Sequence, residues 1–210
     1  TFHGIAQNIS HECSLIKGKT SVDLHWDILR PGRTLKPVVA DLLSTRRDFN
    51  SHWGMSHGAN LFMMLVHPVF TKYSTTPHAS LVRLVDLVQL LRKHPESIAE
   101  ASALLHFSGL ATAGWITLSW LQMLTGNPQA VAFASEIEPG KLRRKYLLDW
   151  LFKNHSTYWL QKPTLVQVGF TLPAHDTLTD AVNAVRQARR CKRSANATLT
   201  AMQKQVSSTT

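Results

Sequence analysis

The stretch from residue 101 to residue 135 contains no Asp, Glu, Lys or Arg, and it constrains the fold more than any other feature. It is long enough to cross a bilayer, which takes about 20 apolar residues. However, Gly109 divides it, and polar residues such as His106 and Gln122 recur along it. Glycine commonly ends a helix, and polar groups are unfavourable in lipid. The pattern therefore predicts two helices buried in a protein core and joined near Gly109, with no membrane span.

The composition indicates a folded protein with a strong positive charge. Of the 210 residues, 44% are hydrophobic and 17% are charged, which is typical of a globular chain. The net charge of +10 favours a polyanionic partner such as nucleic acid, a nucleotide or an anionic membrane surface. An ordinary basic globular protein is the alternative. Cys13 and Cys191 are the only cysteines, so neither a disulfide framework nor a cysteine zinc site is available. No secretory signal pattern is visible, and a cytoplasmic location is expected.

The segment GKTSVDLHWDIL, residues 18–29, predicts the second strand of a β-hairpin. Apolar and polar side chains alternate along it, as in a half-buried strand. The alternating residues are Val22, Leu24, Trp26 and Ile28 on one face and Asp23, His25 and Asp27 on the other. Gly18 and Lys19 are expected to form the turn, and residues 11–16 the partner strand. The Gly-Lys-Thr letters are not a phosphate-binding loop, because the glycine required five residues earlier is replaced by Cys13.

A tight turn would fix which residues of the hairpin face each other. Ser14 is then expected opposite Asp23, and Glu12 opposite His25. The polar face would hold Glu12, Asp23, His25 and Asp27, while Leu24 and Trp26 would enter the core. Carboxylate oxygens are the ligands that magnesium prefers, so this face is a candidate metal site. The alternative is an exposed polar face that binds nothing.

After a Pro- and Gly-rich connector at residues 30–37, helical periodicity dominates. Helices are predicted at residues 38–43, 59–73, 80–93, 95–109, 110–124 and 141–154. A last helix is predicted to be capped by Asp176 or Thr177 and to extend to about residue 205. Residues 44–58 are predicted to be a polar loop. Within residues 80–93 the expected apolar stripe consists of Leu81, Leu84, Val85, Val88 and Leu91.

Some histidines and one acid have simple structural interpretations. His67 lies in an almost wholly apolar helical segment, and we expect a hydrogen-bonded core histidine there. Asp86 is expected to form an ion pair with Arg83 or Arg92, or to cap a neighbouring helix. Three further histidines lie in or near loops without metal-ligand spacing on one element: His52, His57 and His78.

The segments ISHECSLIKGKTSVDLHWDIL, LFMMLVHPVF and LVRLVDLVQLLRK resemble a bacterial family of uncharacterised nucleotidyltransferases in the polymerase-beta-like superfamily. Members of this family have a strand pair that ends in an Asp- or Glu-Leu-His-Trp motif, here DLHW at residues 23–26. A helical part follows, with an apolar helix carrying a His, here His67, and a helix with a central Asp, here Asp86. The likeness covers roughly residues 9–128, and the DLHW strand is its most specific piece.

The resemblance implies an α+β fold, with an N-terminal β-hairpin of a small nucleotidyltransferase-type sheet followed by a mainly helical domain. It also implies transfer of a nucleoside monophosphate from a nucleoside triphosphate to an unknown acceptor, with Mg²⁺ or Mn²⁺. In this reaction Asp23 would be a catalytic residue and metal ligand, and His25 a catalytic residue that supports it. The Gly-rich turn and the Asp-x-Asp strand of the family, which supply the other two carboxylates, do not precede Asp23. Because the chain begins with Thr1 and not Met, it is expected to be the C-terminal portion of such an enzyme, inactive by itself; a diverged inactive homologue is the alternative.

Three parts are expected along the chain. These are a hairpin part at residues 1–36, a helical domain at residues 37–175, and a basic C-terminal helix with a frayed tail at residues 176–210. The second functional hypothesis is a non-enzymatic helical module that binds a polyanion, such as nucleic acid, or a protein partner through this basic helix. Its cations would be Arg186, Arg189, Arg190, Lys192 and Arg193.

Overall fold

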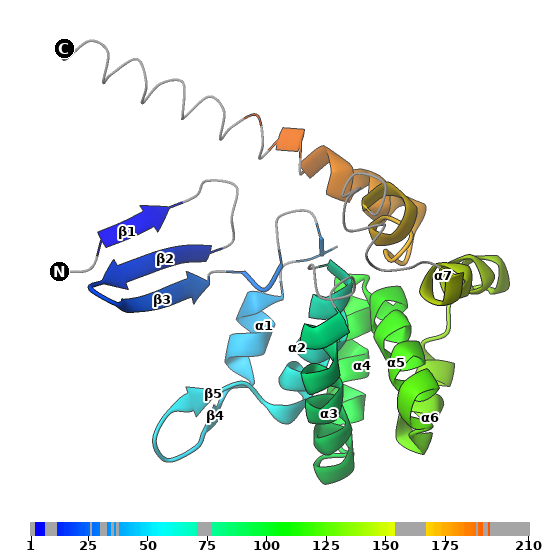
Figure 1. The fold of residues 1–210 in the computed structure, drawn as a ribbon, viewed down its shortest axis with the longest axis horizontal. Coiled ribbons are helices and arrows are strands. Elements are labelled where there is room, and N and C mark those ends of the chain that lie inside the picture. The colour runs from blue at the N-terminus through cyan, green and yellow to red at the C-terminus, as the bar shows by residue number, and fades with distance from the viewer. Residues whose placement is uncertain are drawn as a thin grey trace. The chain divides into compact units, whose positions relative to one another are not determined.

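The computed structural model describes residues 3–6, 12–25, 27–29, 33–34, 36, 38–70, 77–153, 167–187, 189–190 and 193, without the side chains of residues 3–6, 12–14, 23, 77–81, 152–153 and 167. The fold is α+β, as predicted, with small antiparallel sheets in the N-terminal part and helices after them (Figure 1). The chain forms two compact units. The first consists of Thr1–Arg33 and Val182–Thr210, and the second of Thr34–Ala181.

The first unit contains a three-stranded antiparallel sheet with the strand order β1-β2-β3. Its strands are β1 (His3–Ala6), β2 (Glu12–Lys17) and β3 (Thr20–His25). The predicted hairpin is β2 and β3, and its turn is Gly18-Lys19. Gly18 has a φ of 61°, a left-handed conformation that glycine adopts without a steric penalty. The two-residue turn therefore fixes the register of the hairpin.

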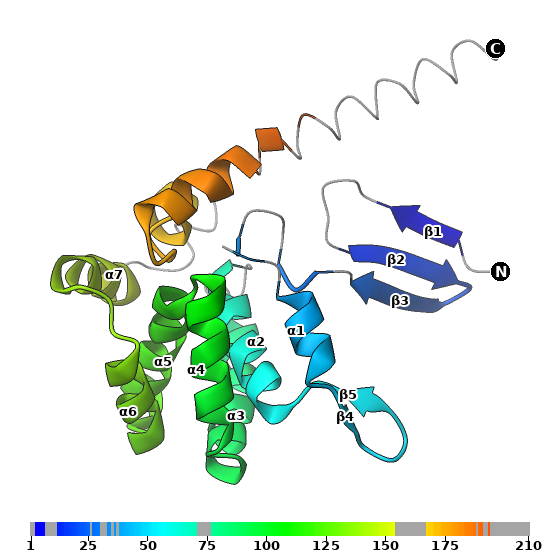
Figure 2. The same cartoon turned by 180° about the vertical axis from the view of Figure 1, so that it is seen from behind.

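The second unit is a helical bundle with one short hairpin. Its elements are α1 (Val39–Ser44), β4 (Arg47–Asp48), β5 (Trp53–Gly54), α2 (His57–Phe70), α3 (Pro77–Lys93), α4 (Ser97–Ser108), α5 (Ala111–Thr125), α6 (Pro128–Glu136), α7 (Lys141–Lys153) and the π-helical turn η2 (Gln167–Thr171). The helices predicted near α1, α2, α3, α4, α5 and α7 are all present. Seen from behind, α4 lies between α2 and α5 (Figure 2).

Helix α2 is the centre of this unit, as its all-round apolar sequence predicts. It contacts α3, α4 and α5. Leu61, Phe62 and Leu65 on α2 have no exposed surface. Because residues on several faces of α2 are buried, this helix supplies much of the core.

Most of the uncharged stretch forms α4 and α5, which meet at Gly109 as predicted, while its last residues belong to a third helix, α6. Gly109 ends α4 with a φ of 71°, and its N–H bonds to the carbonyl of His106. On α5, the buried Thr117 hydroxyl donates to the Leu65 carbonyl of α2 at 2.6 Å, which satisfies a polar group inside the core. Among the described residues, no helix combines the length and the apolar character needed to cross a membrane.

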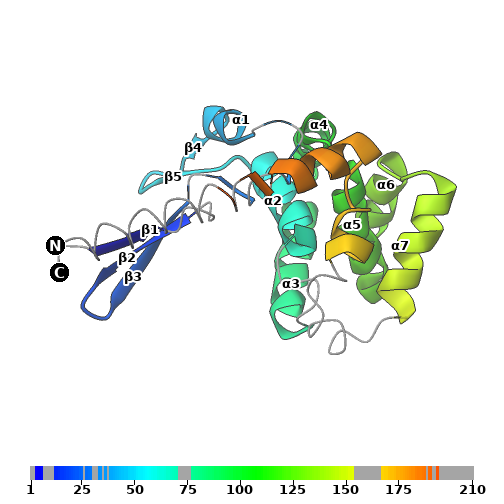
Figure 3. The ribbon, with the colours of Figure 1, turned by 90° about the horizontal axis from the view of Figure 1, so that it is seen from above.

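The residues after η2 lie against the start of α5 (Figure 3). The Asp176 carboxylate accepts hydrogen bonds from the backbone N–H groups of Ala111, at 3.0 Å, and Thr112, at 2.6 Å. The last helix, described at residues 178–187, is capped by the Thr177 hydroxyl, which accepts from the Asp180 N–H at 3.1 Å. Thr177 is therefore the cap of this helix, while Asp176 caps α5 instead.

Two sequence predictions in this unit were wrong, and one helix was missed. Residues 44–58 are not only a polar loop, because they contain the β4–β5 hairpin. The stripe on α3 does not include Val85, which is 59% exposed, whereas Leu87, 1% exposed, is buried instead. Helix α6 was not predicted, although its Pro128 and the capping Asn127 side chain, which accepts from the Ala130 N–H, are a typical helix start.

Candidate functional site

The β2–β3 hairpin brings the predicted site residues to one face of the sheet. The register pairs Ser14 with Asp23 and Glu12 with His25, as predicted. Directly opposite residues of an antiparallel pair point to the same side, so Glu12, Asp23 and His25 share one face. His25 is exposed. The side chains of Glu12 and Asp23, and the whole of Trp26, lie outside the described residues.

Two further predictions about the hairpin were wrong. Strand β3 ends at His25, and Asp27 lies beyond it, where its Oδ1 accepts the Ile28 N–H at 2.7 Å. Asp27 therefore caps a local turn, as aspartate often does, and does not continue the strand face. Leu24, expected in the core, is 58% exposed. A single sheet layer cannot bury its own faces, and burial of Leu24 would need a second layer.

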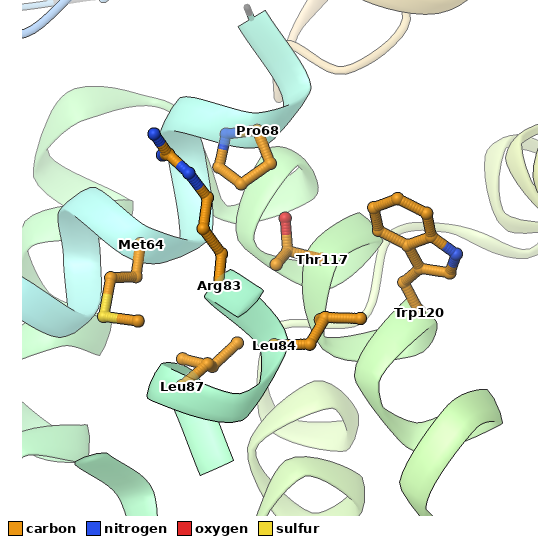
Figure 4. Close-up of a pocket in the computed structure, with 7 residues that line it drawn as sticks. All are labelled: Met64, Pro68, Arg83, Leu84, Leu87, Thr117 and Trp120. Atoms are coloured by element: carbon orange, nitrogen blue, oxygen red, sulfur yellow. The ribbon is translucent and has the colours of Figure 1, made fainter. Parts of the chain in front are cut away.

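Helices α2, α3 and α5 enclose a narrow apolar pocket, shown in Figure 4. Its lining residues are Met64, Pro68, Arg83, Leu84, Leu87, Thr117 and Trp120. Arg83 extends beside Pro68, and its guanidinium lies 3.2 Å from Nδ1 of His67. Arginine is a donor only, so Nδ1 of His67 accepts this bond. His67 is a half-buried, hydrogen-bonded histidine, as predicted, and the pocket has room for about one water molecule and not for a nucleotide.

Asp86 does not form the expected ion pair. Its side chain is exposed on α3, and neither Arg83 nor Arg92 lies within ion-pair distance of its carboxylate. Arg83 is directed to His67 instead. Asp86 is therefore an ordinary surface acid of α3.

A cluster of titratable groups joins the start of α2 to the start of α4, and the sequence did not predict it. The rings of His57 and His94 stack with centroids 3.5 Å apart and planes 10° apart. Nδ1 of His94 lies 3.1 Å from the Glu96 carboxylate, and the Glu100 carboxylate accepts the Ser56 hydroxyl at 2.5 Å. Parallel stacked imidazoles do not direct their nitrogens at one point. The cluster is therefore not a metal site, and no group of three or more His, Cys, Asp or Glu residues that could hold a metal occurs among the described residues.

The pKa of His57 is held below its ordinary value of 6.5 by burial, and then by the nearby charges of His94 and Arg47. Glu96 and Glu100 act in the opposite direction but do not cancel these effects. As the pH falls below 6.5, His57 takes up a proton more readily in the unfolded chain than in the folded one. The contribution of His57 to stability is therefore complete above pH 6.5 and is lost as the pH falls below it. This cluster therefore responds to pH in the range just below neutrality.

We expect His57→Phe, which keeps a ring for stacking but cannot be protonated, to lose this part of the pH dependence. Urea unfolding of the variant and the wild type at pH 7.5 and pH 5.5 would measure it. The stability of the variant relative to the wild type should increase as the pH falls. The control is His106→Phe, at an exposed position of α4. The same pH dependence in wild type and His57→Phe would contradict the expected role of the stacked pair.

Most of the basic residues that were expected to bind a polyanion are among the described residues. Arg186, Arg189, Arg190 and Arg193 are exposed, while Lys192 lies outside the described residues. In α7, Arg143 is not a free surface charge, because its guanidinium donates to the backbone carbonyls of His175, at 3.1 Å, and Asp176. Arg143 therefore holds the segment that caps α5.

An open groove between α5, α6 and α7 is a further concave surface that the sequence did not predict. Its volume is about 270 Å³, and its lining includes Trp115, Gln122 and Arg144. Arg144 forms an ion pair with Glu138, so its charge is already compensated. The groove joins residues far apart in the sequence, and no local motif could have indicated it.

Comparisons of this chain with models of protein families, with curated proteins and with solved structures gave no match. The functional argument therefore depends on the residues and the geometry described above.

Proposed function

We propose that this chain carries part of a metal-dependent nucleotidyl-transfer site, with Asp23 as a ligand of Mg²⁺ or Mn²⁺. His25 supports Asp23 or contacts a phosphate of the nucleoside triphosphate, and the acceptor is unknown. The register of β2 and β3 is the observation that supports this proposal most. It gives Asp23, His25 and Glu12 a common face, where the resemblance to nucleotidyltransferases requires a metal-facing strand.

The residues on this face suit a hard divalent cation. Glu12 is opposite His25 and thus diagonal to Asp23, at a Cα distance of about 7–8 Å for such neighbours. Two carboxylates at this spacing can approach one ion that also binds phosphate oxygens. A bound divalent ion would stabilise the charge that develops on the attacking and leaving oxygens during transfer of the nucleoside monophosphate. Glu12 thus adds a second carboxylate beside the one expected from the DLHW motif.

Nucleotide binding with paired variants tests the proposal. We expect the natural full-length protein to bind Mg²⁺-ATP or another Mg²⁺-nucleoside triphosphate in isothermal titration calorimetry. Asp23→Asn should weaken this binding by about tenfold or more, because an amide lacks the charge of a metal-binding carboxylate. Asp27→Asn is the matched control. It makes the same chemical change beyond the strand and keeps an oxygen for the Ile28 N–H.

Equal affinities of the two variants would remove Asp23 from the proposed role.

The second candidate function is a module that binds polyanions through Arg186, Arg189, Arg190 and Arg193, which are exposed. That function predicts binding of nucleic acid that weakens steeply with salt. It also predicts that the wild type, Asp23→Asn and Asp27→Asn all fail to bind Mg²⁺-nucleotide.

A further inference from the structure

The β4–β5 hairpin exposes two large aromatic side chains. Arg47 pairs with Gly54 and Asp48 with Trp53, and all residues from 43 to 53 are exposed. The exposed fractions of Trp53 and Phe49 are 64% and 39%. Rings of this size are usually buried, so two of them on one short hairpin need an explanation.

Arginine accompanies the more exposed ring. The Arg46 guanidinium lies 5.3 Å from the centre of the Trp53 ring, and it also donates to the Leu43 carbonyl at 3.0 Å. These contacts hold a cation beside the indole, while the large exposed area of Trp53 leaves ring surface open to a ligand. Arg47, the next residue, adds a second exposed cation.

The second ring is also held in place. Phe49 stacks with His52, with ring centroids 5.6 Å apart and planes 18° apart. Its ring passes so close to Gly54 that a β-carbon at this position would lie 2.9 Å from it. Gly54 therefore lets the Phe49 ring lie across β5, and the aromatic side chains of the hairpin have little freedom to lose when a ligand binds.

The one acid of the hairpin, Asp48, is directly opposite Trp53 in the register and lies on the same face. Oδ1 of Asp48 accepts the Asn50 N–H at 2.8 Å and stabilises the turn, in which Asn50 has a φ of 66°. Asparagine is one of the few residues that adopt this left-handed conformation readily. The acid thus has a local structural role on the face that carries Trp53 and Arg46. Arg47, opposite Gly54, and the Phe49 ring, which lies against Gly54, are on the other face of the hairpin.

We propose that the β4–β5 hairpin binds single-stranded nucleic acid through the face that carries Trp53, with a base stacking on Trp53 and a phosphate contacting Arg46. Exposed rings next to arginines are the elements with which proteins bind single strands without sequence preference. The net charge of +10 complements such a ligand. A duplex conceals the faces of its bases, so single strands are favoured. This inference is independent of the proposed nucleotidyl-transfer site, because it uses neither Asp23 nor a metal ion.

Fluorescence anisotropy with a labelled twelve-nucleotide oligothymidylate, at low salt and without metal or nucleoside triphosphate, tests the proposal. We expect Trp53→Ala to weaken binding by about tenfold or more, since one base–aromatic stack contributes this much. Trp53→Phe should keep most of the affinity, which shows that the ring and not the fold is responsible. Arg46→Gln should weaken binding. It should also reduce the slope of the logarithm of the binding constant against the logarithm of the salt concentration by about one.

Leu142→Ala is the control, because Leu142 is an exposed apolar residue, 87% accessible, between the cations of α7. It should bind like the wild type. A duplex of the same length should bind more weakly, and polyglutamate at equal charge should not displace the oligonucleotide. The proposal is wrong if the wild type does not bind, if Trp53→Ala binds like Leu142→Ala, if the duplex binds equally well, or if polyglutamate competes as an acidic polypeptide partner would.

Discussion

Replacement of Phe62 by alanine is expected to lower the free energy of unfolding of the helical unit by about 3–5 kcal/mol. Phe62 has no exposed surface and lies on α2, which contacts α3, α4 and α5. Its removal leaves a cavity at the centre of the unit as well as losing buried apolar surface. Chemical denaturation followed by circular dichroism measures the loss. This is a large part of the total stability of a domain of ordinary size.

Phe107→Ala provides the matched control for this experiment. The ring of Phe107 is 41% exposed on α4, and the ammonium group of Lys36 lies 4.8 Å from the ring centre. The same substitution should cost no more than about 1 kcal/mol at this position. Similar losses for the two variants would contradict the assignment of α2 as the centre of the core.

Replacement of Asp176 by alanine is expected to lower the stability of the same unit by about 2 kcal/mol. Its carboxylate satisfies two N–H groups at the start of α5 and lies next to the positive end of the helix dipole. Alanine leaves both donors without this partner. A thermal melt or urea titration of the two proteins measures the difference.

Asp176→Asn separates the hydrogen bonds from the charge. Asparagine keeps one oxygen that can accept from the N–H groups, so we expect it to lose about half as much stability as alanine does. Thr179→Ala, an exposed change in the following helix, is the control for an effect on that helix alone. If Asp176→Ala is no less stable than Thr179→Ala, the cap does not contribute to α5.

Local sequence patterns were sufficient for most of the helical unit. The uncharged stretch predicted α4 and α5, and Gly109 predicted the point at which they meet, because a left-handed C-terminal residue is a local requirement. The apolar sequence around Phe62 predicted a central helix for the same kind of reason. These predictions use residues only a few positions apart, where periodicity and capping are strongest.

Long-range pairing limited the prediction of the other details. Asp176 had two possible helix starts, its own and that of α5, and only the fold selects α5. Val85 and Leu87 both fit an apolar stripe, and the position of neighbouring helices decides which of them is buried. The β4–β5 hairpin was missed because each strand has only two residues, too few to show an alternating pattern.

The candidate site was predictable where one short turn determines it. Gly18-Lys19 fixed the register that gives Glu12, Asp23 and His25 a common face. The end of β3 was not predictable, because Asp27 continues the alternation and yet its side chain accepts the backbone N–H of Ile28. His57 lies on α2 and His94 in the connection between α3 and α4, so their stack has no local sequence signal.

The most direct test of the central claim is to locate a bound metal ion on the chain by nuclear magnetic resonance. Small amounts of Mn²⁺, which broadens the signals of nearby nuclei, would be added to the ¹⁵N-labelled wild type and to Asp23→Asn. The account predicts selective broadening of amide signals in β2 and β3 near Glu12 and Asp23, and its loss in Asp23→Asn. Broadening centred on another element, or unchanged in the variant, would contradict the proposed metal site.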